Sequence, residues 1–210
     1  REDVRVAVQF FARTASGARD ELAECLKQLG TDYLDVLTYY YVESDAEWAQ
    51  IISVGGAAEV IDAARRDGVV RSIGLTSHQR GLAAGCVSSG RLDSLMIRYN
   101  AAHRGAERDV FPVTEVENRP VVAFTCLRWG GLIRATPDDP PEFSVPSAAN
   151  CYRWVLCQPA VTVALAAPDG RHELDEVLAV ISPFQEMTPA VHSAISDHGD
   201  RVYRHGGGFP

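Results

Sequence analysis

Short apolar segments alternate with longer amphipathic segments along most of this chain, and this alternation restricts its fold more than any other feature. The short segments are rich in β-branched residues, which is typical of buried strands. They cover residues 4–8, 33–40, 69–76, 93–98, 121–125 and 161–165. The longer segments repeat apolar residues every three or four positions, as one face of a helix does. They cover residues 18–29, 57–67, 78–88, 107–116, 146–158, 171–181 and 188–197.

Alternating strands and helices predict a parallel sheet with right-handed crossovers. Both an open doubly wound sheet and a (β/α)8 barrel satisfy this pattern. The first predicted strand is not followed by a GxGxxG loop, which disfavours a dinucleotide-binding Rossmann domain. Periodicity alone leaves the choice between sheet and barrel open.

Local signals predict how several of these segments begin, end or break. Ser16 is expected to cap the first helix and Gly30 to end it. Pro112 is expected to interrupt the helix over 107–116. The remaining stretches are interpreted as a polar, Trp-containing insertion, a Pro- and Asp-rich loop and a loose glycine tail, at residues 43–53, 136–146 and 206–208 respectively.

Composition narrows the class of protein. A chain of 210 residues can form one domain with a sizeable core, and we expect a single domain over 1–210. A net charge of −8 argues against nucleic-acid binding. No apolar run reaches the roughly 20 residues that span a bilayer. The five cysteines include no CxxC pair, which is typical of a reduced, cytoplasmic protein without a thiolate metal site.

Five phrases, in their order and spacing, resemble the aldo-keto reductase family. They are LKQLGTDYLDVL (26–37), DGVVRSIGLTSH (67–78), IRYNAAHRGAE (97–107), VAFTCLRWG (122–130) and YRWVLCQPAVTVALAAP (152–168). The resemblance implies an α/β fold, a (β/α)8 TIM barrel of which this chain holds six of the eight β/α units, strands three to eight of the family. Because an incomplete barrel leaves strand edges unpaired, we expect a further N-terminal segment or a partner chain to complete it.

The resemblance places two substitutions at the family's catalytic positions. The family's Lys, at the end of its third strand, corresponds to Gln9, and its His, at the end of its fourth strand, corresponds to Tyr40. The family's catalytic Asp and Tyr belong to the missing units. Gln9 carries no charge and cannot lower the pKa of a phenol by Coulomb attraction. Tyr40 is interpreted either as a replacement proton donor or as an aromatic that fills the space of the His. Tyr39 and Tyr41 should point away from Tyr40 if the strand continues.

The resemblance also implies an NADP(H) or NAD(H) cofactor. The family's nicotinamide contacts correspond to hydrogen-bonding, thioether and stacking side chains, which are Thr76, Ser77, Met96, Phe124 and Thr125. Met96 lacks the amide of the family's Gln, whereas Phe124 keeps a stacking face. The basic residue that binds the 2′-phosphate of NADP corresponds to Asp169, with Arg171 two residues later. A carboxylate repels phosphate, so Arg171 is the candidate for that contact.

Candidate substrate contacts follow the predicted strand ends, the active face of such barrels. They are Arg98, Asn100 and Trp129. Arg98 and Arg128 are expected to suit an anionic ligand.

Other polar residues near these ends are assigned structural roles. Arg104 and Glu107 are interpreted as an ion pair at a helix start. His78 and His103 are interpreted as hydrogen-bonding residues because neither has a metal-ligand partner at helical spacing.

Three functions are compatible with this sequence. The first is NAD(P)H-dependent reduction of a small carbonyl compound with a degenerate catalytic set. The second is a non-redox enzyme on the same barrel, such as a cyclase, lyase or isomerase. The third is a non-catalytic ligand-binding or scaffold protein. The expected partner is a small-molecule ligand, with no nucleic acid and no membrane.

Overall fold

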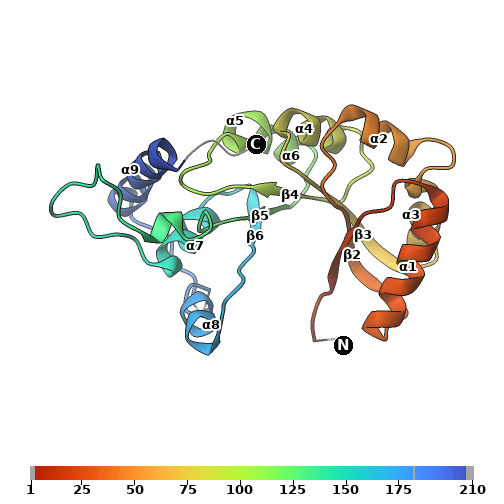
Figure 1. The fold of residues 1–210 in the computed structure, drawn as a ribbon, viewed down its shortest axis with the longest axis horizontal. Coiled ribbons are helices and arrows are strands. Elements are labelled where there is room, and N and C mark those ends of the chain that lie inside the picture. The colour runs from red at the N-terminus through yellow and green to blue at the C-terminus, as the bar shows by residue number, and fades with distance from the viewer. Residues whose placement is uncertain (1–2, 182, 207–210) are drawn as a thin grey trace. The chain divides into compact units, whose positions relative to one another are not determined.

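A computed structural model describes residues 3–181 and 183–206, and its chain divides into two compact units (Figure 1). Unit 1 comprises the chain up to Met96 together with Val113–Arg119, and unit 2 comprises Ile97–Pro112 and the chain from Pro120 onward. The described residues form six strands in the sheet order β1-β2-β3-β4-β5-β6, the same as their order in the sequence. The predicted succession of six β/α units is therefore confirmed.

Unit 1 contains the first three strands and the first four helices. The strands and helices are β1 (Ala7–Phe10), α1 (Ala15–Leu29), β2 (Leu34–Tyr39), α2 (Asp45–Ile52), α3 (Ala57–Arg66), β3 (Val70–Ser77) and α4 (Arg80–Ser88). β1 pairs with β2 and β2 with β3, both in parallel. Helices α1 and α3 lie side by side on one face of these strands (Figure 1).

The two faces of the β1-β2-β3 strands differ in character. On the helix-covered face, Phe10, Tyr39 and Leu75 are neighbours in register, and all three are buried. On the opposite face, Gln9 is in register with Thr38 and Thr38 with Gly74. A Cβ on Gly74 would lie 2.8 Å from Ser94 Oγ and 3.1 Å from Thr38 Oγ1, so the close approach of these side chains requires glycine there.

β4 (Ser94–Arg98) and α6 (Phe111–Val116) each include residues of both units. Unit 2 continues with α5 (Ala106–Asp109), β5 (Val121–Phe124), a 3-10 helix η1 (Gly131–Ile133), α7 (Ala148–Leu156), β6 (Val161–Ala164), α8 (Arg171–Leu178) and α9 (Pro189–His205). β5 pairs with β6 in parallel, with a bulge at Val121/Val122.

Several predicted boundaries are wrong, for identifiable reasons. The first strand covers 7–10, not 4–8, because Val6 donates its N–H to the side chain of Asp35 and not to a backbone carbonyl. The first helix starts three residues early because Thr14, not Ser16, accepts the capping hydrogen bond from Gly17 N–H. The predicted insertion at 43–53 contains helix α2, capped by Ser44.

Two helices near the C-terminal half of the chain also differ from expectation. The helix over 107–116 breaks at Val110, so that Pro112 lies in the first turn of α6, where proline needs no N–H partner. The last helix extends eight residues further than predicted, to His205, because Ile195, His198, Gly199 and Val202 are buried against the unit. Of the predicted loose tail, residues 207–208 lie outside the described residues.

Candidate functional site

Gln9 and Tyr40 lie at the carboxyl ends of adjacent strands in unit 1. Gln9 is exposed on β1. Tyr40 follows β2 and continues its pairing, because its N–H donates to the carbonyl of Phe10 at 2.9 Å. Side-chain alternation places Gln9 and Phe11 on the same face as Thr38 and Tyr40. The ring of Tyr40 meets that of Phe11 edge to face, with centroids 4.9 Å apart.

The strand does not continue through Tyr41. The backbone there turns into the left-handed region, with φ of 59°, which is unusual for a bulky residue. The Tyr40 and Tyr41 rings lie 5.3 Å apart and are tilted by 54°. The expected alternation of Tyr41 required a continuing strand, and β2 ends at Tyr39. Tyr39 does alternate away, onto the helix-covered face, where burial raises the pKa of its phenol.

Four rings therefore follow the ends of β1, β2 and β3 as one continuous row, which we name the aromatic strip: Phe11, Tyr40, Tyr41 and His78. The His78 imidazole completes it, with its centroid 4.7 Å from that of Tyr41. Phe11 and Tyr41 are 60% and 46% exposed. The strip therefore offers ring faces to solvent instead of filling the core.

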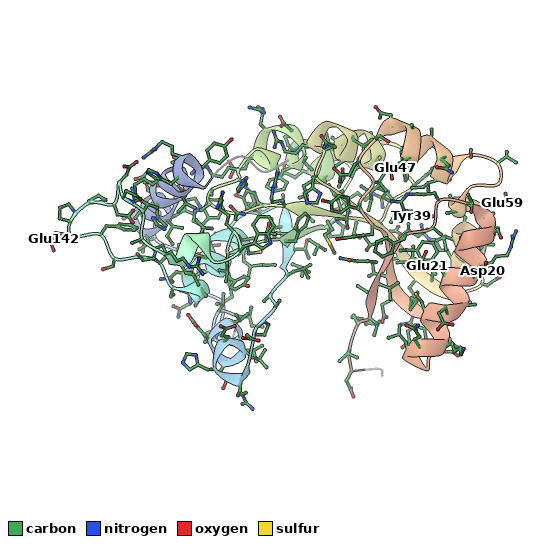
Figure 2. The ribbon with its side chains drawn as sticks, viewed as in Figure 1. Asp20, Glu21, Tyr39, Glu47, Glu59 and Glu142 are labelled. Carbon is green, nitrogen blue, oxygen red and sulfur yellow. The ribbon has the colours of Figure 1, made fainter. Side chains whose placement is uncertain are left out.

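Polar contacts anchor the backbone under the aromatic strip. Glu21 on α1 accepts hydrogen bonds from the N–H groups of Phe11 and Ala12 at 2.8 and 2.7 Å (Figure 2). Arg13 donates to the carbonyls of Phe11 and Tyr40 at 2.9 and 2.6 Å. Its Nε lies 3.5 Å from Glu47 on α2. These contacts fix both loops from which the rings project.

A carboxylate orients the imidazole of His78. Oε1 of Glu43 accepts a hydrogen bond from His78 N–H at 2.7 Å and lies 3.2 Å from its ring Nδ1. Oε2 of Glu43 accepts from the Gln79 side chain at 3.3 Å. The side chains of His78 and Glu43 are 14% and 24% exposed. Sequence reasoning assigned His78 a hydrogen-bonding role but missed Glu43, which lies 35 residues away along the chain.

Thr76 and Ser77 end β3 on opposite faces. Ser77 Oγ accepts from Gln79 N–H at 3.0 Å and so closes the turn into α4. Thr76 is buried, and its Oγ1 has no hydrogen-bond partner within the described part of the chain. Met96, on β4, is partly exposed. Of these three cofactor candidates, Thr76 is the one with a buried polar atom left for another group.

In unit 2, the loops after β4 and β5 are joined through Asn100. This fully buried side chain donates to the carbonyl of Thr125 at 2.9 Å and accepts from the N–H groups of Ala102 and His103, both at 3.0 Å. Thr125 has a φ of 53°, and its buried Oγ1 has no partner among the described residues. Asn100 therefore shapes the strand ends, and the structure brings it next to Thr125 and Phe124.

The other substrate candidates lie in the same stretch of unit 2. Arg98 ends β4 and is partly exposed. Trp129 is 57% exposed. Arg128, Trp129 and Gly130 are consecutive left-handed residues, with φ of 50°, 50° and 81°. Arg128 is turned inward and donates to the carbonyl of Gly206 at 2.7 Å; burial lowers the pKa of its guanidinium.

The predicted Arg104–Glu107 ion pair is wrong. Arg104 donates instead to Asp200 and to the carbonyl of Ser196 on α9. Glu107 accepts from the hydroxyl of Tyr99 at 2.7 Å. Burial, followed by the hydrogen bond and charge of Glu107, raises the pKa of the Tyr99 phenol. Glu107 therefore bonds to a tyrosine of the preceding strand end, and Arg104, which precedes α5, bonds to α9.

Arg171, the candidate contact for a 2′-phosphate, is the first residue of α8. Arg171 is turned to Asp175, with Nε 2.8 and 2.9 Å from the two carboxylate oxygens. The carboxylate of Glu173 accepts a hydrogen bond from the N–H of Asp169 at 2.7 Å. The N–H groups at the start of the helix therefore face a carboxylate of the same helix. A pocket of about 110 Å³ lies beside this turn, and its lining residues are Leu127, Ile133, Ala148, Tyr152, Ala167, Pro168, Glu173, Glu176 and Val177.

The part of the chain that the structure describes was also compared with the requirements of a metal site, a disulfide and a membrane-spanning helix. No cluster of three or more His, Cys, Asp or Glu side chains there could hold a metal ion. All five cysteines are free. Among residues 3–181 and 183–206, every helix is too short or too polar to traverse a bilayer.

These features define a class of α/β protein built from successive β/α units, with polar and aromatic side chains gathered at strand ends. The fold is shared with the aldo-keto reductase AKR11C1 from Bacillus halodurans. Its holo form superposes with a TM-score of 0.75 at 15% identity, over 94% of this chain and 73% of that one. Its apo form gives 0.76 at 17% identity, over 94% and 72%.

The sequence comparisons specify the family. The model of the aldo/keto reductase family matches residues 1–144. A D-threo-aldose 1-dehydrogenase from a Pseudomonas species is 26% identical over 126 residues, which are 59% of this chain and 37% of that relative. The chain belongs to the aldo/keto reductase family, and its expected fold is confirmed as six strands of the family's (β/α)8 barrel. The match spans little more than a third of the relative's length.

Proposed function

We propose that this protein is a nicotinamide-dependent oxidoreductase that interconverts a hydroxyl and a carbonyl on a small polyhydroxylated substrate. The observation that carries the proposal is membership of the aldo/keto reductase family, over residues 1–144. The relative named as an aldose dehydrogenase supports a sugar-like substrate class. Exposed rings beside ionisable groups in the aromatic strip suit such a ligand, since sugars present apolar C–H faces and polar edges.

The acidic start of α8 supports NAD(H) as the preferred cofactor form. Arg171, the first residue of this helix, is paired with Asp175, and its side chain is 85% exposed. Glu173 and Glu176 line the adjacent pocket. Carboxylates accept hydrogen bonds from a ribose 2′-hydroxyl but repel a 2′-phosphate. When bound, the nicotinamide supplies or accepts a hydride; the chain's own residues bind it and handle the accompanying proton.

Titration of the purified protein with NADH and NADPH tests this proposal, with binding followed by fluorescence and calorimetry. NADH is expected to bind at least tenfold more tightly than NADPH, a difference of about 1.4 kcal/mol. Glu176→Gln should narrow the difference because it removes one repelling charge, whereas Glu142→Gln, at the tip of the loop before α7 (Figure 2), should leave it unchanged. Absence of binding at millimolar concentrations of both would refute the redox function and favour a non-redox enzyme or a binding protein.

A further inference from the structure

The Glu43–His78 contact has the geometry of an oriented acid–base pair. A neutral imidazole carries one proton, and a carboxylate can only accept hydrogen bonds. Because Nδ1 lies 3.2 Å from Glu43 Oε1, the proton of the neutral ring belongs on Nδ1. Nε2 is then the basic nitrogen, through which the ring can take up or release a proton. The second bond, from His78 N–H to the same oxygen at 2.7 Å, fixes where the carboxylate lies.

The loop that carries Glu43 is held firmly in place. Its own N–H donates to Glu47 Oε2 on α2 at 2.8 Å. The neighbouring Val42 donates to the carbonyl of Thr76 at 3.0 Å, which ties the end of β2 to the end of β3. The carboxylate is therefore preorganised toward the imidazole, as a residue that sets a tautomer must be.

The aromatic strip supplies a binding surface beside this pair. The ring of Tyr41 contacts the imidazole at 4.7 Å and is 46% exposed. Its left-handed backbone holds the ring in this position at a conformational cost, and such strain is concentrated at ligand-binding sites. The nearby charges, Glu43 and Glu47 against Arg13, are on balance negative. A neutral polyhydroxylated ring therefore suits the surface better than an anion.

We propose that His78, oriented by Glu43, exchanges the proton with the reacting oxygen of a sugar that stacks on Tyr41. This proposal rests on the proposed oxidoreductase function and names the groups that replace the family's Lys and His, whose positions hold Gln9 and Tyr40. In oxidation, the O–H bond of the anomeric hydroxyl breaks and an N–H bond forms at Nε2. The hydride leaves the same carbon for an oxidised nicotinamide nucleotide, so a C=O bond forms. The imidazolium then returns its proton to water.

Kinetics of the full natural chain test the proposal, with free aldopentoses and aldohexoses as probes and NAD+ or NADP+ as oxidant. His78→Asn keeps an N–H donor toward Glu43 but has no basic nitrogen. It should lower kcat by roughly 10²- to 10⁴-fold and flatten the dependence of kcat/KM on pH. Glu43→Gln should lower kcat because the amide no longer favours one tautomer. His205→Asn, at the exposed end of α9, is the matched control and should behave as the wild type.

A second variant separates binding from proton transfer. Tyr41→Asn removes the ring but retains a residue that tolerates the left-handed backbone, so the fold should be kept. It should raise KM for the sugar while kcat changes little. Unchanged kcat and an unchanged pH profile in His78→Asn would overturn the proposal and leave the oxidoreductase function standing.

Nitrogen NMR of the histidines measures the tautomer of His78 beside Glu43 and does not depend on turnover. The wild type should show His78 as the Nδ1–H tautomer, and addition of the aldoses should shift its signals and those of Tyr41. Glu43→Gln should populate the other tautomer. Sugar-induced shifts without turnover would reject the redox function yet retain the site, whereas an Nε2–H tautomer, or no shift at saturating sugar, would reject the site.

Discussion

The imidazole of His198, fully buried in α9, lies 3.2 Å from Oδ1 of Asp139 and 3.1 Å from the carbonyl of Leu132. Both partners offer an oxygen atom that can accept a hydrogen bond from the ring. Asp139 also accepts from Arg201 Nε at 2.6 Å and from Thr136 N–H at 2.6 Å. One carboxylate thus attaches the loop between η1 and α7 to the last helix.

Replacement of this carboxylate should destabilise the protein and change its response to acid. Burial tends to raise the pKa of Asp139, but hydrogen bonds from Thr136, Arg201 and His198 outweigh burial and lower the pKa to about 2. Its stabilising contribution is therefore complete above pH of about 4 and is lost as the pH falls toward 2. Asp139→Asn should cost about 3 kcal/mol at neutral pH.

Urea unfolding between pH 2 and 7 measures both effects. The difference between wild type and Asp139→Asn should shrink as the pH falls below about 4, while Glu142→Gln should track the wild type throughout. A constant difference down to pH 2 would show that the carboxylate is not held as its contacts indicate.

Two helical glycines should respond in opposite directions to alanine. A Cβ on Gly199, in α9, would overlap the backbone carbonyl of Ala101, whereas a Cβ on Gly85, in α4, would meet nothing within 4 Å. Gly199→Ala should therefore destabilise by about 1–3 kcal/mol, and Gly85→Ala should stabilise by about 0.5–1 kcal/mol through its better helix propensity. Thermal unfolding compares them directly, and a gain in Gly199→Ala would mean that α9 packs less closely than described.

Two buried tyrosine hydroxyls offer a similar contrast. The hydroxyl of Tyr39 has no partner among the described residues, whereas that of Tyr99 donates to Glu107 at 2.7 Å. Tyr39→Phe should be neutral or stabilise by up to about 1 kcal/mol, since an unsatisfied buried polar group is removed. Tyr99→Phe should destabilise by about 1–2 kcal/mol. Denaturant midpoints, compared at a constant m-value, rank the stabilities of the two variants. Equal losses of stability in Tyr39→Phe and Tyr99→Phe would contradict the expected contrast.

Cysteine labelling should divide the thiols by burial. Burial raises the pKa values of Cys86, Cys126 and Cys151 to about 12, so little thiolate forms at neutral pH. Cys25 and Cys157 are partly exposed, although burial and then the charges of Glu21 and Glu24 raise the pKa of Cys25. Mass spectrometry after brief iodoacetamide treatment at pH 7.5 should find Cys157 modified first. Early modification of Cys126 or Cys151 would indicate that unit 2 opens locally.

Local patterns in the sequence predicted the fold better than the contacts of the site. Apolar periodicity identified all six strands, since every observed strand overlaps one of the predicted apolar segments. Helix caps were less certain, since Thr14 and Ser16 carry the same chemistry and only the turn geometry selects between them. Helix α2 was missed because its eight residues, Asp45–Ile52, make little more than two turns and show little periodicity.

The site depends on pairs that lie far apart in the sequence. Nothing near His78 indicates that Glu43, 35 residues earlier, orients its ring. The left-handed turn at Tyr41 was also unforeseen, because tyrosine has no preference for that conformation and the strand pattern runs on to that point. A resemblance to a family assigns positions such as Gln9 and Tyr40, but it does not reveal what new partners a divergent chain has acquired.

The contacts of α9 have a consequence for the order of events during synthesis. Arg104, Arg128 and Asp139 bond to residues 96, 78 and 62 positions later, all at or near this last helix. At about 5–20 residues per second on the ribosome, the middle of the chain emerges several seconds before those partners exist. Unit 1, whose strands pair with near neighbours, can form first. Until the last helix is made, Arg104, Arg128 and Asp139 lack these partners. A chaperone that shelters emerging chains would therefore act chiefly on residues 97–139.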